Sequence, residues 1–474
     1  MLLCGDWVLP ISSPPVADGA ILVTGRTIGA VGPAAELRAR YPGEEVLDFS
    51  GCALLPGLVN AHTHLDYSAF RGFSPSCGFS RWILRLLRAR RRLDSDDLAT
   101  SALWGAHECA RSGVTAIADT SCDGWTVARA AGAAGLRARV YLELFGLDDT
   151  QLPETMERLE AALERLKQES SVGNEAGTSG PPVEWGISPH APYTVSERLY
   201  REAARFARRA GVRMVTHVAE SRAEVDLLES GKSALAFAYR AAHLWTGLRW
   251  KPPGISPLQY VAGGEALGPD MLVVHAVQVD GEDIVTLADS GATVAHCPRS
   301  NQRLRCGVAP VAEMKAAGVT VGLGTDSLAS NASLDMFEEM RAALQGSRER
   351  TLSGGSTAAV AGAGGDDDPA LSRESRSVPL TPAAVLRMAT LDGAQALGWD
   401  HLVGSLEAGK RADIVAVRLP GAEVDPTTVL VEGATAADVQ MTLVDGIVTY
   451  EGTEDPVDVA RGLGAVRTKL GLGD

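Results

Sequence analysis

The segment PGLVNAHTHLD, residues 56–66, decides the fold. Its residues 58–61 (LVNA) are mostly apolar, typical of the start of a strand buried on both faces in a parallel sheet. Residues two apart in a strand point to the same face, so His62 and His64 place two imidazoles side by side where this strand ends. Such a pair is a natural set of ligands for a divalent metal ion.

Seven similar apolar segments follow, separated by longer stretches with helical patterns that are clearest at 153–169 and 196–210. With residues 58–65, the expected strands are 114–120, 137–145, 183–190, 212–220, 271–277, 292–298 and 319–327. Eight such units over about 340 residues predict an α/β fold, a closed (β/α)₈ TIM barrel.

Both ends of the chain have a different pattern. Residues 1–54 and 403–474 contain short alternating segments with turns, typical of antiparallel strands. We therefore expect a barrel over 55–402 and a small composite β-sandwich domain formed by both termini, with a C-terminal tail.

Three segments look like insertions. Residues 170–182 and 353–369 are rich in Gly, Ser, Asp and Pro and are expected to be mobile loops. Residues 228–262 lengthen the link between the fifth and sixth strands and are expected to cover the barrel mouth.

The composition limits which binding partners and which cellular location are expected. The net charge of −15 argues against a nucleic-acid or anionic-membrane partner. Seven scattered cysteines without a CxxC pair favour reduced thiols. With no basic n-region at the start and no apolar run of about 18 residues, we expect neither a signal peptide nor a membrane helix, and a cytoplasmic location.

Histidines cluster at the expected strand ends, where this kind of barrel builds its active sites. His217 on the fifth strand and Asp326 on the eighth can complete a ligand shell with His62 and His64. Imidazole and carboxylate ligands suit Zn²⁺ best, with Fe²⁺ or Mn²⁺ as alternatives. A metal ion lowers the pKa of bound water, and Asp326 can then accept the proton.

Three more residues at the strand ends are candidates for the reaction. Glu220, three residues after His217, could reach a substrate nitrogen, and His275 could polarise the water or orient the leaving group. His190 is expected to line the substrate pocket.

Motifs of other kinds of functional site are incomplete or absent. GKS at 231–233 lacks the upstream glycine of a phosphate loop, and no HExxH motif is present. The basic run RLLRARRRL at 85–93 is spaced as an amphipathic helix, which favours a solvated face over an anion site.

Together the motifs resemble the amidohydrolase superfamily, in its metal-dependent deaminase and chlorohydrolase branch. The resemblance covers nearly the whole chain and rests on PGLVNAHTHLD, SPHAPYTVS, HVAES, VVHAV, HCPRSN, GLGTDS, MATLDGAQALG and GSLEAGKRADIVAV. It implies the same ligands and the same roles for Glu220 and His275. The expected fourth strand has no lysine for a second metal ion, so one ion per chain is expected.

The segment DYSAFRGFSPSCGFSRWI, residues 66–83, resembles aminodeoxyfutalosine deaminases of menaquinone biosynthesis. It suggests Phe79 and Trp82 as substrate contacts, and Arg71 or Arg81 as partner of a substrate carboxylate.

The expected activity is hydrolytic deamination of an aminopurine nucleoside, a small-molecule substrate, by a possible homodimer. S-adenosylhomocysteine/methylthioadenosine or guanine deamination, dechlorination and amide hydrolysis remain alternatives. So does a metal-free binding scaffold, although such a protein should lack some of these ligands.

Overall fold

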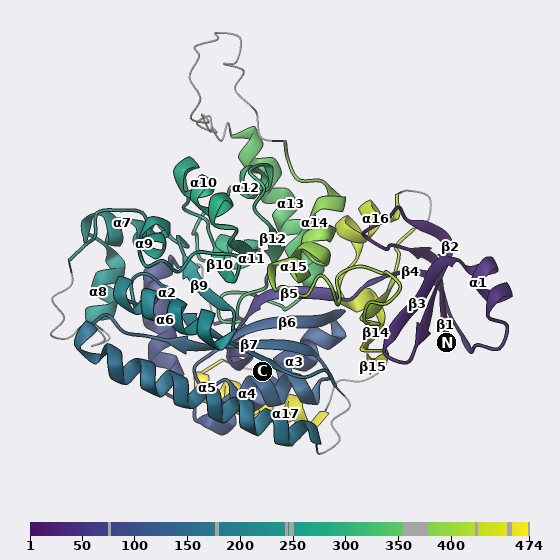
Figure 1. The fold of residues 1–474 in the computed structure, drawn as a ribbon, viewed down its shortest axis with the longest axis horizontal. Coiled ribbons are helices and arrows are strands. Elements are labelled where there is room, and N and C mark those ends of the chain that lie inside the picture. Colours follow the sequence, from purple (N-terminus) through teal and green to yellow (C-terminus); the bar gives the residue numbers. More distant parts are fainter. Residues whose placement is uncertain are drawn as a thin grey trace, which may run out of the picture.

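The computed structural model describes residues 1–73, 77–175, 180–241, 245, 251–353, 378–421, 425–452 and 457–472. Two sheets organise them, one of eight strands and one of seven (Figure 1). The expected TIM-like barrel, with a separate β domain built from both ends of the chain, is confirmed.

The eight-stranded sheet runs in chain order, and its neighbouring strands pair in parallel. Its strands are β5 (Leu58–Thr63), β6 (Val114–Ser121), β7 (Arg137–Leu144), β8 (Glu184–Pro189), β9 (Met214–Val218), β10 (Met271–His275), β11 (Thr293–His296) and β12 (Val321–Leu323). Each one lies within an expected strand or overlaps it closely, because near-continuous apolar runs are what a sheet buried on both faces requires.

The first and last barrel strands meet just beyond β12. Thr63 and Asp326 form a parallel bridge, and the Asp326 N–H donates to the His62 carbonyl oxygen at 3.1 Å. Gly324 permits this approach, because a Cβ there would lie 2.9 Å from the backbone N and O of His62. The seam closes the barrel at the point where the expected ligands stand.

The seven-stranded sheet has the order β15-β14-β13-β4-β1-β2-β3. Its strands are β1 (Leu2–Val8), β2 (Val16–Thr24), β3 (Thr27–Pro33), β4 (Val46–Pro56), β13 (Ile414–Arg418), β14 (Val439–Val444) and β15 (Ile447–Tyr450). Strand β4 pairs with β1 on one side and with β13 on the other, so it joins the N-terminal and C-terminal parts in one sheet.

Helices surround the barrel and connect its strands (Figure 1). The α-helices are α1 (Ala34–Arg40), α2 (Phe79–Arg90), α3 (Ser95–Arg111), α4 (Trp125–Ala133), α5 (Leu152–Glu175), α6 (Glu197–Ala210), α7 (Arg222–Ser230), α8 (Ala234–Ala241), α9 (Pro257–Gly263), α10 (Gly281–Ser290), α11 (Pro298–Arg303), α12 (Val311–Ala316), α13 (Met336–Leu352), α14 (Pro382–Met388), α15 (Leu391–Ala396), α16 (Pro426–Gly433) and α17 (Val457–Leu470). Short 3₁₀ helices are η1 (Leu65–Phe70), η2 (Asp149–Gln151) and η3 (Ala436–Asp438).

The expected insertions have different outcomes. Helix α5 continues to Glu175, so the prediction of a loop from residue 170 is wrong for residues 170–175. Residues 354–369 lie outside the described residues. The segment 228–262 contains α8 and α9, with parts of it also outside the description.

The C-terminal helix α17 leaves the β domain and packs against α3 and η1 of the barrel. Lys469 anchors it through hydrogen bonds from Nζ to both carboxylate oxygens of Asp97, at 2.6 and 2.8 Å. The tail thus closes over the outside of the barrel instead of extending the β domain.

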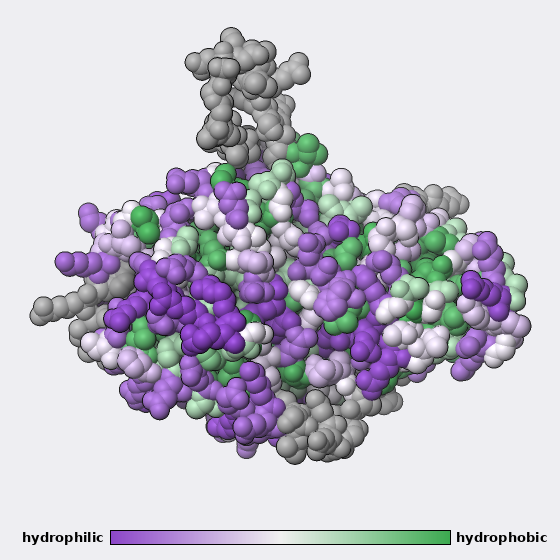
Figure 2. Space-filling model, viewed as in Figure 1, coloured by the Kyte–Doolittle hydropathy of each residue, from purple (hydrophilic) through white to green (hydrophobic). Residues whose placement is uncertain are grey.

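On the face drawn in Figure 2, hydrophilic side chains spread over the surface and apolar ones stand in small separate groups. Among the described residues, no helix combines the length and hydropathy that a bilayer crossing needs.

A buried ion-pair network joins the barrel to the β domain. Arg137 at the start of β7 donates to both carboxylate oxygens of Asp413, at 3.1 and 3.2 Å, and to Asp445 at 3.0 Å. Its side chain is 7% exposed and the two carboxylates are 1% and 3% exposed. Removing one member of such a network leaves buried charge uncompensated.

We therefore expect Arg137→Ala to lower the free energy of unfolding by about 3–5 kcal/mol in urea denaturation followed by tryptophan fluorescence. The control is Arg158→Ala, which removes an exposed pair with Glu154 in α5 and should cost less than about 0.5 kcal/mol. Equal effects of the two substitutions would argue against the network as the link between the domains.

Candidate metal centre and active site

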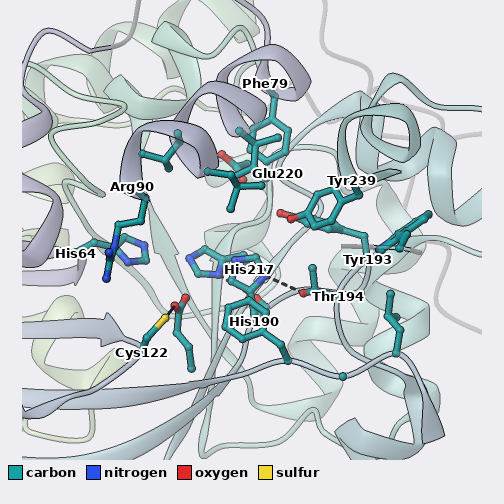
Figure 3. A pocket seen from close by; sticks show the side chains of 18 of the residues that line it. His64, Phe79, Arg90, Cys122, His190, Tyr193, Thr194, His217, Glu220 and Tyr239 are labelled. Atoms are coloured by element: carbon teal, nitrogen blue, oxygen red, sulfur yellow. Dashed lines mark hydrogen bonds between the residues drawn. The ribbon is translucent and has the colours of Figure 1, made fainter. Parts of the chain in front are cut away.

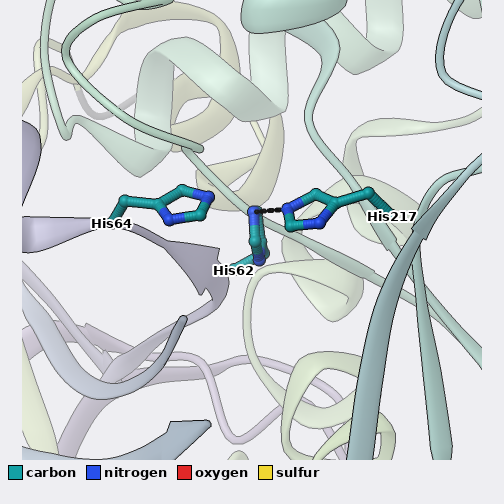
Figure 4. A group of neighbouring side chains, drawn as sticks. All are labelled: His62, His64 and His217. Atoms are coloured by element: carbon teal, nitrogen blue, oxygen red, sulfur yellow. Dashed lines mark hydrogen bonds between the residues drawn. The ribbon is translucent and has the colours of Figure 1, made fainter. Parts of the chain in front are cut away.

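Three imidazoles converge at the mouth of the barrel. His62 lies on β5, His64 follows it, and His217 lies on β9. Their candidate ligand atoms all lie within 4.8 Å of one another, and Nε2 of His62 is 3.3 Å from Nε2 of His217 (Figure 4). Strand ends fix these positions, so the sequence spacing was sufficient to find them.

Asp326 completes the cluster from beyond β12. Its Oδ1 lies 3.6 Å from Nε2 of His64 and 3.8 Å from Nε2 of His62. Its Oδ2 accepts hydrogen bonds from the hydroxyls of Ser300 and Ser330, at 2.6 and 2.7 Å. The two hydroxyls orient the carboxylate so that Oδ1 faces the imidazoles.

The outer ring nitrogens are held by backbone carbonyl groups. His64 Nδ1 lies 2.9 Å from the Thr120 carbonyl oxygen, and His217 Nδ1 lies 2.9 Å from that of His190. Because a carbonyl oxygen only accepts, each Nδ1 donates to it, and the lone pair of each ring lies on Nε2. This is the usual outer support of metal-binding histidines.

The electrostatics also fit a cation. Burial, reinforced by the neighbouring imidazoles, holds the pKa values of His62 and His217 well below the usual histidine range. Imidazoles that disfavour a positive charge, with Nε2 lone pairs beside an oriented carboxylate, could hold one divalent ion.

Glu220 and His275 stand beside this cluster. His275 Nε2 lies 3.7 Å from Glu220 Oε1, and His275 Nδ1 lies 2.9 Å from Asn301 Oδ1. Burial, and then the charges of Asp326 and Glu224, raises the pKa of Glu220 well above its usual value. A raised pKa favours the protonated form, from which a carboxyl group can donate a proton to a substrate.

Left-handed backbone conformations concentrate at these strand ends. Ala219, His275, Ala276 and Asp326 have φ values of 53°, 76°, 45° and 55°. Such conformations are costly for residues with a side chain and cluster at functional sites.

One buried carboxylate holds the turn that carries Glu220. Glu224, on α7, accepts the N–H of Ala219 at 3.0 Å and the N–H of Glu220 at 2.8 Å. It is fully buried, and burial raises its pKa to about 7 against these hydrogen bonds. Glu224 is a positioning residue, because it orients Glu220 through the backbone.

A cavity of 1030 Å³ opens above the cluster (Figure 3). It is lined by residues that include three expected substrate contacts, His190, Phe79 and Trp82. Trp82 is fixed by a hydrogen bond from Nε1 to the Ala329 carbonyl oxygen at 2.9 Å, and its ring centroid lies 5.7 Å from that of Phe79. The segment 228–262 contributes Tyr239 and Trp245 to the lining, as its expected place over the mouth requires.

Arg71 does not lie where the sequence analysis expected it, beside a substrate carboxylate. It is not among the residues that line the cavity, and its guanidinium pairs with Glu108 of α3. The η1 turn directs it toward the outer helices, where its carbonyl oxygen also accepts from Arg467 of α17. Arg81, the alternative partner for a carboxylate, is exposed and outside the lining.

The lining residues that the sequence analysis did not single out include Arg90, Cys122 and Glu143. Arg90 lies in the basic run that was interpreted as a solvated face. The spacing from Phe79 through Leu86 to Arg90 follows the apolar face of α2, which was the available signal.

Comparison with known proteins identifies the family. A model described as the amidohydrolase family matches residues 53–448, and an imidazolonepropionase-like composite domain of bacteria matches residues 19–43. The chain belongs to the amidohydrolase family. It is therefore a hydrolase that acts on carbon–nitrogen bonds other than peptide bonds, in a metal-dependent superfamily.

Relatives of this amidohydrolase include a 5-methylthioadenosine/S-adenosylhomocysteine deaminase of Moorella thermoacetica, 34% identical over 93% of this chain and 91% of the relative. An adenosine deaminase from Xanthomonas campestris with bound zinc has the same fold, with a TM-score of 0.76 at 24% identity over 99% of this chain and 98% of the other. A Helicobacter pylori aminofutalosine deaminase also shares it, with a TM-score of 0.73 at 21% identity over 94% and 99% of the two chains.

We expect single alanine substitutions at His62, His64 or His217 to reduce bound metal from about one ion per chain to well below half, because each removes one of few ligands. Plasma mass spectrometry of the dialysed protein measures this. The matched control is His401→Gln, an exposed histidine outside the cavity lining, which should keep the full metal content. Full metal content in all three alanine variants would rule out this cluster as the metal site.

We expect Glu224→Gln to lower kcat by roughly 10- to 100-fold while metal content stays the same, because an amide NH₂ would oppose one of the two backbone N–H groups. Glu229→Gln on the same helix is the control, since Glu229 is exposed. Steady-state kinetics with metal analysis tests both variants. A parallel fall in metal content and activity would point to general structural damage instead.

Proposed function

We propose that this amidohydrolase is a hydrolytic deaminase of an adenine-type nucleoside, with aminodeoxyfutalosine as its first candidate substrate. The observation that supports this most strongly is the pairing of the buried Glu220, whose pKa burial raises, with His275, 3.7 Å apart, beside a candidate metal cluster. Deamination of a ring amidine needs both a proton donor for the ring nitrogen and a stabiliser for the attacking oxygen.

In this proposal His62, His64, His217 and Asp326 hold one divalent ion, Zn²⁺ by preference. The end of β8 reads Glu184–Pro189 followed by His190, without a lysine that could bridge a second ion. The nitrogen and oxygen donor set also suits Fe²⁺ or Mn²⁺.

When bound, the ion supplies a water molecule of lowered pKa as the nucleophile. Asp326 accepts the water proton through Oδ1, while Ser300 and Ser330 hold its other oxygen. Glu220 delivers a proton to the ring nitrogen next to the carbon that bears the amine. His275, fixed through Nδ1 by Asn301, stabilises the attacking oxygen through Nε2. Asp326 would then pass the water proton to the amine, so that the carbon–nitrogen bond breaks and ammonia leaves. The proton of the added hydroxyl would return to Glu220, and the ring carbon becomes a carbonyl.

A second candidate is deamination of methylthioadenosine or S-adenosylhomocysteine. It is favoured by the similarity to the 5-methylthioadenosine/S-adenosylhomocysteine deaminase of Moorella thermoacetica, at 34% identity. Both candidates require the same chemistry and differ only in the substituent at the 5′ carbon of the sugar.

The test is ammonia release by the metal-analysed protein with aminodeoxyfutalosine, S-adenosylhomocysteine, methylthioadenosine, adenosine, guanine and cytosine. We expect release from an adenine-type nucleoside, and a fall in kcat of about 10²- to 10⁴-fold in Glu220→Gln, because the proton donor is lost. Asp400→Asn, an exposed substitution, is the control and should keep full activity.

If none of these compounds releases ammonia although the protein holds about one metal ion per chain, the proposed substrates are excluded. If the protein releases no ammonia and binds no metal after reconstitution, a non-catalytic scaffold is supported.

A further inference from the structure

One face of helix α2 forms a wall of the cavity. The lining residues on this helix are Phe79, Trp82, Ile83, Leu86, Leu87 and Arg90. They recur at helical spacing, so they share one face. This wall is apolar over its first turns and ends in a single arginine.

The charges of the cavity lining set Arg90 apart. Among the described lining residues it is the only Arg or Lys, whereas five carboxylates line the same cavity. Two of these, Glu220 and Asp326, belong to the reaction centre. Asp148 caps η2 and Asp149 accepts the Ser196 hydroxyl at 2.6 Å.

The fifth carboxylate, Glu143 on β7, also has a donor. It accepts the thiol of Cys122 at 3.1 Å, on the side of the cavity where Figure 3 shows Arg90 and His64. Arg90 has no comparable partner. Its guanidinium donates from Nη1 to the Leu93 carbonyl oxygen at 3.4 Å, and no described carboxylate forms an ion pair with it.

Arg90 also differs from its neighbours on α2. Arg85 and Arg88 are exposed on the other face, as the amphipathic pattern predicts, whereas Arg90 is half-buried. An arginine on the cavity face that makes one hydrogen bond and no ion pair with the described residues is suited to receive an anion, and its planar fork matches a carboxylate.

We propose that Arg90 binds a carboxylate at the end of the substrate's 5′ substituent, and that the apolar wall of α2 packs against the spacer between the sugar and this carboxylate. The proposal rests on the proposed function and narrows its substrate class. Trp82 and Arg90 are separated by a helical rise of about 12 Å, enough for a sugar followed by a short apolar chain or ring. The substrate is then an adenine-type nucleoside with an apolar spacer and a terminal carboxylate.

Four nucleosides with one thioether linkage test the charge requirement. They are 5′-methylthioadenosine, which is neutral; the 3-carboxypropylthio analogue, an anion; the 3-aminopropylthio analogue, a cation; and S-adenosylhomocysteine, a zwitterion. For each, kcat/KM is measured with the metal-loaded enzyme. The Kd of the corresponding hypoxanthine nucleoside, which undergoes no deamination, is measured by calorimetry.

We expect the anion to have the highest kcat/KM and its product the lowest Kd. Arg90→Gln should weaken binding of the anion by roughly 10- to 100-fold, the value of a charge-assisted hydrogen bond, and leave the neutral nucleoside within about twofold. Arg90→Lys should recover part of the loss, because it keeps the charge without the fork. Arg88→Gln, on the exposed face of α2, is the matched control and should leave the binding of both nucleosides unchanged.

Two results would overturn the proposal. Equal losses for anionic and neutral nucleosides in Arg90→Gln would mean that Arg90 has only a structural role. A preference for the zwitterion or the cation that disappears in Glu143→Gln would mean that Glu143 selects an ammonium group instead. Failure of the proposed function is distinguishable from both, because none of the four nucleosides would then release ammonia.

Discussion

The seam between β5 and the segment after β12 is the constraint on which the rest of the site depends. Hydrogen bonds at this seam join residues about 263 positions apart: the Thr63 hydroxyl donates to the Asp326 carbonyl oxygen, and the Asn60 amide holds Thr325. The same contacts close the barrel and bring Asp326 within 4 Å of His62 and His64. Folding of the barrel and assembly of the candidate metal centre are therefore one event. A change that loosens the seam would separate the carboxylate from the imidazoles even if every ligand were retained.

Burial gives the centre its chemical character. Each ring nitrogen that faces away from the cluster at His64, His217 and His275 has an oxygen partner, so the opposite nitrogens face inward. Burial lowers the pKa values of His217 and His275 and raises that of Glu220. These shifts, together with the oriented carboxylate of Asp326, favour the distribution of protons that the proposed deamination requires before the substrate binds.

The sequence predicted the strands and the ligand cluster because both follow from position along the chain. Residues at the ends of parallel strands must meet at one end of a barrel, so His62, His217 and Asp326 could be brought together without coordinates. Side chains on helices are harder to place. Arg71 was expected at the substrate, but a 3₁₀ turn sends it outward to Glu108.

Arg90 shows a second limit of prediction from a helical pattern. The helical pattern correctly separated the exposed Arg85 and Arg88 from the apolar face, yet a pattern does not say what lies opposite that face. Glu143 gave no sequence signal at all, because a single acid on a strand is common, and only the fold brings it across from α2. The course of α17 over α3 likewise depends on tertiary contacts such as Lys469 to Asp97.

The central claim is that one divalent ion lies among four named side chains, beside Glu220 and His275. Anomalous diffraction from crystals of the metal-loaded enzyme, recorded at the absorption edge of the metal, tests it most directly. The expected result is a single peak per chain, at about 2.0–2.2 Å from Nε2 of His62, His64 and His217 and from Oδ1 of Asp326. A peak away from these atoms, or two peaks of comparable height in the cavity, would contradict the claim.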